Sequence, residues 1–230
     1  MKSRPLHCLV HISRTAGSKV NEVIANSGMD AWPHIEGQKH NDLKLGQITN
    51  SAEFISGHIP FREFRAIISQ YISRKLVFHT FIREPTMQVA RYYYWLIEIF
   101  YRGVNFYETH RLKVKDMSLK ISCTDNKNSK LIINNLEQYS DFFLNRQTYY
   151  VLGKRNFTSL IDELSALDYT WFLNKLDEFF KQMYFVGYTI PTLNKPNYHF
   201  RKEIFLESKI QEFLYIYNSS CNEIFSKSIN

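Results

Sequence analysis

Cysteine, proline and glycine are all scarce in this 230-residue chain, which has 3, 6 and 8 of them. So little glycine and proline excludes a collagen-like or low-complexity chain, and 44% hydrophobic residues exclude a wholly disordered one. Cys8, Cys123 and Cys221 are odd in number, far apart and without a C-x-x-C pair. Neither a disulfide framework nor a cysteine zinc site is indicated, and we predict a cytoplasmic protein.

Long apolar runs and targeting segments are missing as well. No stretch approaches the ~18 apolar residues of a membrane span. The apolar run at 6–12 is interrupted by His7 and His11 and lacks a small-residue cleavage site, so it does not predict a signal peptide. A membrane-anchored parent, trimmed to this chain, stays open. The eight histidines include no H-E-x-x-H and no visible metal-ligand set, and we expect no metal.

Positive charge is in excess, because 29 Lys and Arg face 22 Asp and Glu, a net charge of +7. This balance fits an anionic partner such as nucleic acid, a phosphate-bearing cofactor, an acidic glycan or a membrane surface. It fits an ordinary soluble basic protein equally well. The length predicts a single domain over 1–230, and 16% aromatic residues predict an aromatic-rich core.

Apolar patterning alternates between the two regular structures. Short apolar runs predict strands at 6–12, 54–59, 76–82 and 184–188. Helical spacing predicts helices at 19–25, 86–101 and 203–227. The alternation predicts an α/β fold with a mainly parallel central sheet. The polar segments 28–50 and 103–130 are expected to be variable surface segments, and the tyrosines 92–94 favour core packing over base stacking.

The segment 13–18 (S-R-T-A-G-S), between the first strand and the first helix, resembles an anion-binding turn. A helix N-terminus presents backbone N–H groups and a positive dipole end to an anion. Small side chains let a phosphate approach, Thr15 and Ser18 offer hydroxyl donors, and Arg14 adds a cation. The spacing is not that of a Walker A loop. The alternative is an ordinary turn with Ser18 as the helix N-cap.

Two more candidates follow later strands. Arg83 stands at the end of the 76–82 strand, where open α/β sheets bind ligands, so that it and the first loop can grip a doubly phosphorylated ligand. The alternative for Arg83 is a surface salt bridge to a group such as Glu84. His58, in S-G-H-I-P-F, also stands near a strand end, and an imidazole there can act as a general base. The alternative is a structural histidine.

Five segments, in order, resemble the motifs of sulfotransferases that use 3′-phosphoadenosine 5′-phosphosulfate (PAPS). The similarity is to the carbohydrate type, such as heparan sulfate 2-O-sulfotransferases and bacterial relatives. The segments are 11–18 (H-I-S-R-T-A-G-S), 55–61 (I-S-G-H-I-P-F), 81–85 (F-I-R-E-P, running on to Y-Y-Y), 145–148 (N-R-Q-T, with Gly153) and 185–189 (F-V-G-Y-T).

The resemblance implies a P-loop-like three-layer fold and transfer of a sulfuryl group from PAPS to a hydroxyl of a sugar or glycan, without a metal. It implies a 5′-phosphosulfate site made by Arg14, Thr15, Ala16, Gly17, Ser18 and Lys19. Arg83 would bind the 3′-phosphate. His58 matches the proposed catalytic base of the family, and Arg14 would stabilise the leaving bisphosphate.

Three positions depart from the family pattern. Arg14 replaces the loop lysine and keeps the charge without being equivalent to it. Arg91 replaces a serine that commonly helps to hold the 3′-phosphate, and a cation there can still contact that phosphate. Ile190 replaces an acid. An inactive relative therefore stays open.

Two other function classes stay open beside the sulfotransferase. A P-loop kinase or NTPase would need Walker A spacing and an aspartate for magnesium, and neither is evident. A nucleic-acid-binding protein would fit the net charge, but the basic residues do not form a strip with the aromatic ones. We expect a sugar or glycan partner and no nucleic acid. Glu63 and Glu98 are the alternative bases.

Overall fold

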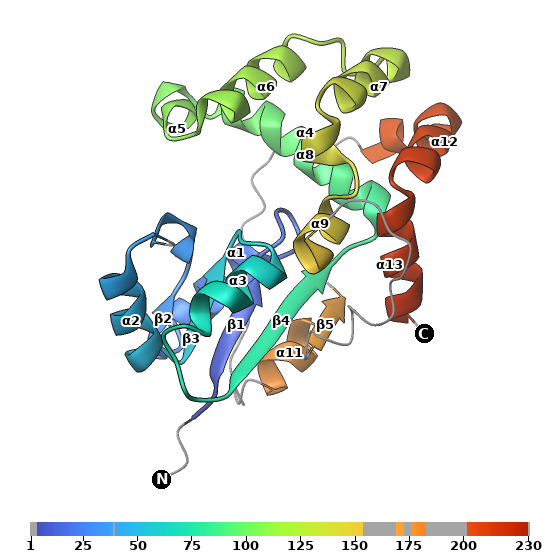
Figure 1. The fold of residues 1–230 in the computed structure, drawn as a ribbon. Coiled ribbons are helices and arrows are strands. Elements are labelled where there is room, and N and C mark those ends of the chain that lie inside the picture. Colours follow the sequence, from blue (N-terminus) through green and yellow to red (C-terminus); the bar gives the residue numbers. More distant parts are fainter. Residues whose placement is uncertain (1–3, 39, 154–168, 173–175, 183–201, 230) are drawn as a thin grey trace. The chain divides into compact units, whose positions relative to one another are not determined.

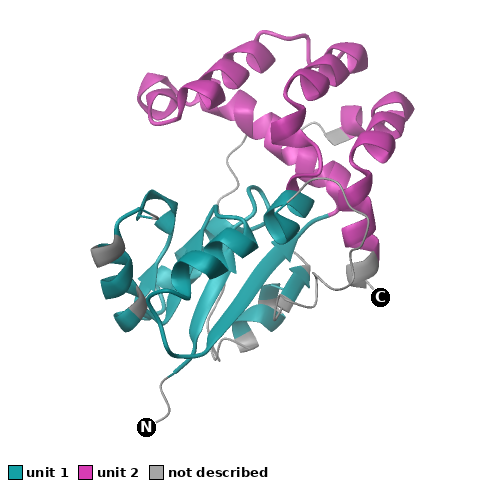
Figure 2. Cartoon of the chain, viewed as in Figure 1, with its two compact units in different colours: residues 1–83, 147–192, 227–230 teal, residues 84–146, 193–226 magenta. Residues whose placement is uncertain are grey.

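The computed structural model describes residues 4–38, 40–153, 169–172, 176–182 and 202–229 (Figure 1). The chain divides into two compact units, coloured separately in Figure 2. Unit 1 comprises 1–83, 147–192 and 227–230, and unit 2 comprises 84–146 and 193–226. The predicted strand at 184–188 and Ile190 lie outside the described residues.

Unit 1 is built on a parallel sheet of five strands in the order β2-β3-β1-β4-β5 (Figure 1). The strands are β1 (Leu6–Val10), β2 (Ala31–Trp32), β3 (Phe54–Gly57), β4 (Leu76–Ile82) and β5 (Tyr169–Phe172). The central strands β1, β3 and β4 are nearly continuous apolar runs because both of their faces are buried. The predicted α/β fold with a parallel sheet is confirmed.

Helices cover both faces of this sheet and make three layers. The helical elements of unit 1 are α1 (Gly17–Ala25), η1 (Ile35–Gln38), α2 (Asp42–Ser51), α3 (Phe61–Ile68), most of α9 (Arg146–Leu152) and α11 (Leu176–Gln182). Leu9 and Phe81 pack on one face, in a cluster with residues of α1 and α11. On the other face, Phe78 meets Phe61 and Phe64 of α3 edge to face, with ring centroids 5.1 and 5.8 Å away.

The polar segment 28–50 is more regular than its sequence indicates, since it contains β2, η1 and most of α2. The Asn41 side chain caps α2 by accepting a hydrogen bond from the Lys44 amide at 3.1 Å. Leu45 and Ile48 are buried. Two buried apolar residues and one cap are enough for a helix here, and such a weak pattern did not predict it.

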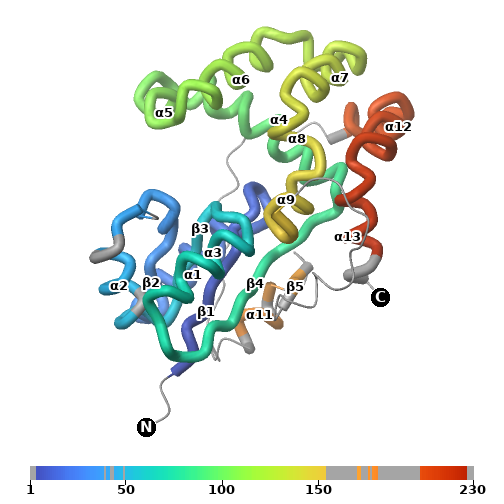
Figure 3. The backbone as a smooth tube through the Cα atoms, viewed as in Figure 1, coloured from blue at the N-terminus to red at the C-terminus, as the bar shows by residue number. Residues whose placement is uncertain are grey.

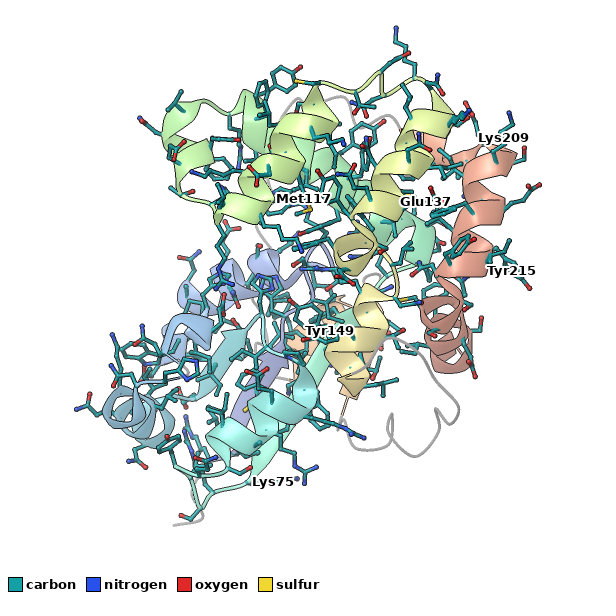
Figure 4. All side chains as sticks on the ribbon, turned by 45° about the horizontal axis from the view of Figure 1, so that its top comes forward. Lys75, Met117, Glu137, Tyr149, Lys209 and Tyr215 are labelled. Carbon is teal, nitrogen blue, oxygen red and sulfur yellow. The ribbon has the colours of Figure 1, made fainter. Side chains whose placement is uncertain are left out.

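Unit 2 is helical around an apolar cluster (Figure 3). Its elements are α4 (Pro85–Tyr101), α5 (Val104–Glu108), α6 (Leu112–Ser122), α7 (Ser129–Gln138), α8 (Ser140–Phe143), η3 (Lys202–Leu206), α12 (Ser208–Tyr217) and most of α13 (Ser219–Ile229). Segment 103–130 therefore forms helices, and Met117 and Ile121 of α6 are buried in the cluster (Figure 4). None of the helices in the described residues is long and apolar enough to cross a membrane.

Tyrosines of α4 form the centre of the apolar cluster in unit 2. Tyr92 and Tyr93 are buried. The Tyr93 hydroxyl donates to Asn126 Oδ1 at 2.7 Å and accepts from Asn135 Nδ2 at 3.0 Å. These two rings pack inside unit 2 and present no face on which a base could stack, so the prediction of core packing is confirmed for them.

The buried His79 and the half-buried His7 form a pair on the α1 side of the sheet. The Trp171 indole N–H donates to His79 Nδ1 at 3.3 Å, so the proton of His79 is on Nε2, which lies 2.9 Å from His7 Nδ1. The rings of His7 and His79 are stacked. Burial, together with the neighbouring His7, lowers the pKa of His79 from 6.5 to about 3.

Acid should therefore destabilise unit 1 through His79. Between a folded pKa of about 3 and an unfolded pKa of 6.5, the unfolded chain binds one more proton at this site. The free energy of unfolding falls as the pH drops through this window, by up to about 1.4 kcal/mol per pH unit for the one site. Urea unfolding between pH 4 and 7 measures the slope.

His79→Gln should reduce that slope by the contribution of one proton. The exposed His40→Gln is the matched control, since its ring is in water in both states. An unchanged slope in His79→Gln would contradict the assignment of the acid sensitivity to this residue.

Candidate functional site

Three of the segments that resemble sulfotransferase motifs end at one edge of the sheet. The central strand β1 lies between β3 and β4, and Val10 is in register with Gly57 on one side and Thr80 on the other. The strands are parallel, so the residues that follow them meet at the carboxyl edge. The His11 amide donates to the Gly57 carbonyl at 2.9 Å there, and Thr80 Oγ1 donates to the Val10 carbonyl at 3.0 Å. This edge is where doubly wound sheets bind ligands.

The loop between β1 and α1 has left-handed backbone at Arg14 and Ala16, with φ of 69° and 81°. Left-handed residues in a tight turn point successive N–H groups towards one side and make an anion-binding concavity. Ala16 is the N-cap of α1, and its carbonyl accepts from the amides of Lys19 and Val20. The alternative in which Ser18 caps the helix is wrong, because the helix already begins at Gly17 and Ser18 is its exposed second residue.

Thr15 shapes this loop from inside. Its side chain is buried, and its hydroxyl donates to the Ile12 carbonyl at 2.8 Å. The hydroxyl proton is thus committed to the main chain, so the donor role expected of Thr15 is not what the structure shows. Arg14, Ala16 and Lys19 are half-buried.

Gly17 is required by the close approach of a histidine ring. A Cβ built on Gly17 would lie 1.9 Å from His11 Cδ2 and 2.2 Å from His11 Nε2. His11 is 3% exposed, and burial with the nearby His58, His34 and Arg14 lowers its pKa from 6.5 to about 2. The His11 imidazole that packs against Gly17 is therefore neutral.

His58 is held by that same loop segment. Its Nδ1 lies 2.6 Å from the His11 carbonyl, which can only accept, so the proton of His58 is on Nδ1 and the lone pair is on Nε2. The His58 amide donates to Glu36 Oε2 at 3.1 Å. The ring is stacked on His11 with centroids 4.0 Å apart, and the residue is half-buried. The proton on Nδ1 leaves the lone pair on Nε2, and this tautomer is the form that a general base needs.

Residues that the sequence did not single out also lie around His58. His34 Nδ1 lies 3.4 Å from Glu36 Oε1, and His34 Nε2 lies 3.5 Å from Asn21 Nδ2. Ser56 Oγ donates to Asn21 Oδ1 at 2.8 Å, which ties β3 to α1. The sequence signal for the approach of Glu36 is Gly57, because a glycine in a strand often marks a place where another group approaches closely. A Cβ built on Gly57 would lie 3.2 Å from Glu36 Oε2.

Arg83 is positioned by Gln147, from the fourth segment. The Arg83 amide donates to Gln147 Oε1 and the Arg83 carbonyl accepts from Gln147 Nε2, both at 2.8 Å. One buried side-chain amide thus satisfies both main-chain groups of Arg83. The next residue, Glu84, caps α4 by accepting from the amides of Thr86 and Met87.

Three other predicted residues lie on helices rather than directly after strands. Arg91 is exposed on α4 and Glu98 is half-buried on the same helix, both in unit 2. The contact of Arg91 with a 3′-phosphate therefore stays a prediction. Glu63 is exposed in the first turn of α3.

Gly17→Ala should destabilise the protein by about 1–3 kcal/mol, the usual cost of forcing extra atoms into a packed site. The new methyl group would displace the His11 ring, and with it the carbonyl that orients His58. Gly37→Ala is the matched control, since a Cβ there meets nothing within 4 Å. Urea unfolding measures both variants, and equal stability of the two would contradict the contact.

Comparison of the chain with protein-family models, with curated proteins and with solved structures found no match.

Proposed function

We propose that this chain is a sulfotransferase that moves a sulfuryl group from PAPS to a hydroxyl of a sugar or glycan. The observation that carries the proposal is the hydrogen bond from His58 Nδ1 to the His11 carbonyl. It joins the candidate base to the segment that leads into the candidate phosphate loop. The motif resemblance alone does not require this coupling, whereas a transferase needs its base beside the reacting group.

The loop between β1 and α1 fits a phosphosulfate by the character of its donors. Left-handed residues at Arg14 and Ala16, and the N-terminus of α1, are backbone features of the kind that bind anions. Gly17 and Ala16 carry too little side chain to block an anion. Arg14 adds a charge that can stabilise the oxygen bridging sulfur and phosphorus as negative charge develops on it.

Arg83 provides the second cation of the proposed site. Gln147 holds its main chain, so the guanidinium extends from a fixed point at the end of β4. In the proposed complex Arg83 binds the 3′-phosphate, while the first loop binds the 5′ end. Two cationic sites after neighbouring parallel strands suit a bisphosphorylated nucleotide.

His58 Nε2 would accept the proton of the acceptor hydroxyl. As that proton leaves, the hydroxyl oxygen forms a bond to sulfur, and the bond between sulfur and the bridging phosphate oxygen breaks. The bisphosphate departs with the electron pair, and its new charge is met by Arg14 and the loop amides. As in phosphoryl transfer, the protein would act mainly by aligning the attacking and leaving oxygens and by stabilising the negative charge that develops.

The proposed acceptor is a sugar or glycan, and the net charge of +7 suits an anionic one. Burial of Tyr92 and Tyr93 removes two of the rings that a nucleic-acid-binding protein would use for stacking. A cytoplasmic location is part of the proposal, on the strength of cysteine usage. The cofactor role of Arg91 also belongs here, as a cation that can pair with the 3′-phosphate.

Adenosine 3′,5′-bisphosphate should raise the melting temperature of the protein. A ligand at ~100 times its Kd stabilises by about 2.7 kcal/mol, which corresponds to about 5–10 °C for a chain of this size. Arg14→Ala should remove most of the shift. Lys75→Ala is the matched control, because Lys75 is an exposed cation at the amino end of β4, the opposite edge of the sheet (Figure 4).

The same measurement separates the function classes. If ATP with magnesium stabilises the protein and the bisphosphate does not, the result favours a kinase or NTPase. If an oligonucleotide stabilises it instead, the result favours a nucleic-acid-binding protein. The absence of any shift at millimolar bisphosphate would overturn the proposed site.

His58→Ala should lower turnover by ~10²-fold or more while leaving the affinity for the bisphosphate nearly unchanged. The reason is that His58 Nε2 serves the acceptor hydroxyl and not the nucleotide. The loss should appear equally in kcat and kcat/KM, because proton transfer develops only in the transition state. Isotopically labelled PAPS with pools of glycan acceptors, read by mass spectrometry, supplies the assay.

Glu63→Gln is the control for the alternative base and should keep full turnover. A stable His58→Ala protein with near-normal turnover would exclude His58 as the base.

A further inference from the structure

Three histidines from separate parts of unit 1 converge beside the β1–α1 loop. One ring nitrogen of each of His11, His34 and His58 lies within 4.8 Å of the others. The ring centroid of His34 lies 5.6 Å from that of His11 and 5.6 Å from that of His58. They come from the end of β1, the segment before η1 and the end of β3. Because they are far apart in the sequence, no ligand spacing indicated them.

The hydrogen bonds around these rings resemble those around metal-bound histidines. Such a histidine usually donates its second ring N–H to a main-chain carbonyl or a carboxylate, which directs the other nitrogen towards the metal. His58 Nδ1 donates to the His11 carbonyl, and His34 Nδ1 lies 3.4 Å from the Glu36 carboxylate. In both residues Nε2 is therefore the nitrogen suited to a metal, and at His34 the metal would replace the Asn21 amide, whose Nδ2 lies 3.5 Å from Nε2.

The third ring and the backbone supply two independent observations. His11 is 3% exposed, and its Nδ1 is buried without a hydrogen-bond partner among the described residues. Such an unsatisfied buried nitrogen is costly and calls for a partner. His34 has φ of 60°, a left-handed backbone that is uncommon for a residue other than glycine and clusters at functional sites.

We propose that His11, His34 and His58 form a binding site for a divalent transition-metal ion of the Zn²⁺ class. Imidazole nitrogen suits zinc, copper and nickel, and three histidines with an open fourth position are a known zinc arrangement. Each of the three nitrogens would lie about 2.0–2.1 Å from a bound zinc ion, so the nitrogens must move closer together. The rings of His11 and His58 are inclined by 27°, so they must also rotate for both to present an edge to one ion. His34, which is exposed, can move towards the other two rings.

The site has one consequence that rests on the proposed function. A metal bound to His58 Nε2 occupies the lone pair that the transfer reaction uses, so Zn²⁺ should inhibit the proposed transferase. Metal binding itself rests only on the three histidines.

The test is titration of the full, chelator-treated chain with Zn²⁺ by calorimetry, and with Co²⁺ by visible absorption. We expect one ion per chain and the intense visible bands of a low-coordinate Co²⁺ site. His34→Ala should weaken binding at least 10-fold, while His40→Ala, an exposed histidine outside the cluster, should not change it. Mg²⁺, which prefers oxygen ligands, should not compete.

Absence of Zn²⁺ binding, or equal binding by the wild type and His34→Ala, would overturn the proposed metal site. His34 is on the surface, so this variant tests the site without disturbing the buried His11. The bisphosphate melting experiment is independent of it. Bisphosphate binding without zinc binding removes only the metal site, whereas zinc binding without bisphosphate binding removes only the proposed transferase.

Discussion

The parallel pairing of β1 with β3 on one side and β4 on the other is the constraint on which the candidate site depends. Segments that are separated by tens of residues end at one edge because parallel strands share a direction. His58 then reaches the carbonyl of His11, and Thr80 reaches that of Val10. An antiparallel pairing would send one of these segments to the opposite edge. The register therefore sets which side chains can act together.

Within that edge, the main chain is positioned by a few polar contacts. Gln147 occupies both main-chain groups of Arg83, and Glu36 accepts from the His58 amide. Thr15 closes the first loop onto Ile12. Each contact fixes backbone rather than the group that would react. The main chain that carries the cations and imidazoles at the carboxyl edge is therefore held in place. Electrostatic stabilisation of a transition state would need such a preorganised arrangement.

The same histidine cluster carries the proposed base and the proposed metal site. Glu36 connects them, because one oxygen accepts from the His58 main chain and the other lies beside His34. A base needs the lone pair on His58 Nε2, and a metal would take it. The two roles are therefore alternatives at one nitrogen, and both follow from the hydrogen bond that keeps the proton on Nδ1.

Local sequence determined the strands and helices with strong apolar patterns. The run at 76–82 became β4 with its predicted bounds, and the helix at 86–101 begins one residue earlier because Pro85 suits the first helical position. Tyr92 and Tyr93 on that helix are buried, in agreement with the predicted core packing. Weakly patterned segments were missed, as at α2 and α6, because a few buried residues decide such helices only once they find a partner surface.

What only the tertiary structure decided is the set of partners. The sequence placed Arg14, His58 and Arg83 after strands, but gave no means of pairing Gln147 with Arg83 or His34 with Glu36. The reason is physical: a hydrogen bond between residues far apart in the chain depends on the register of the sheet and the packing of its helices. Residue type and position determined the candidates, and the parallel sheet decided which of them meet.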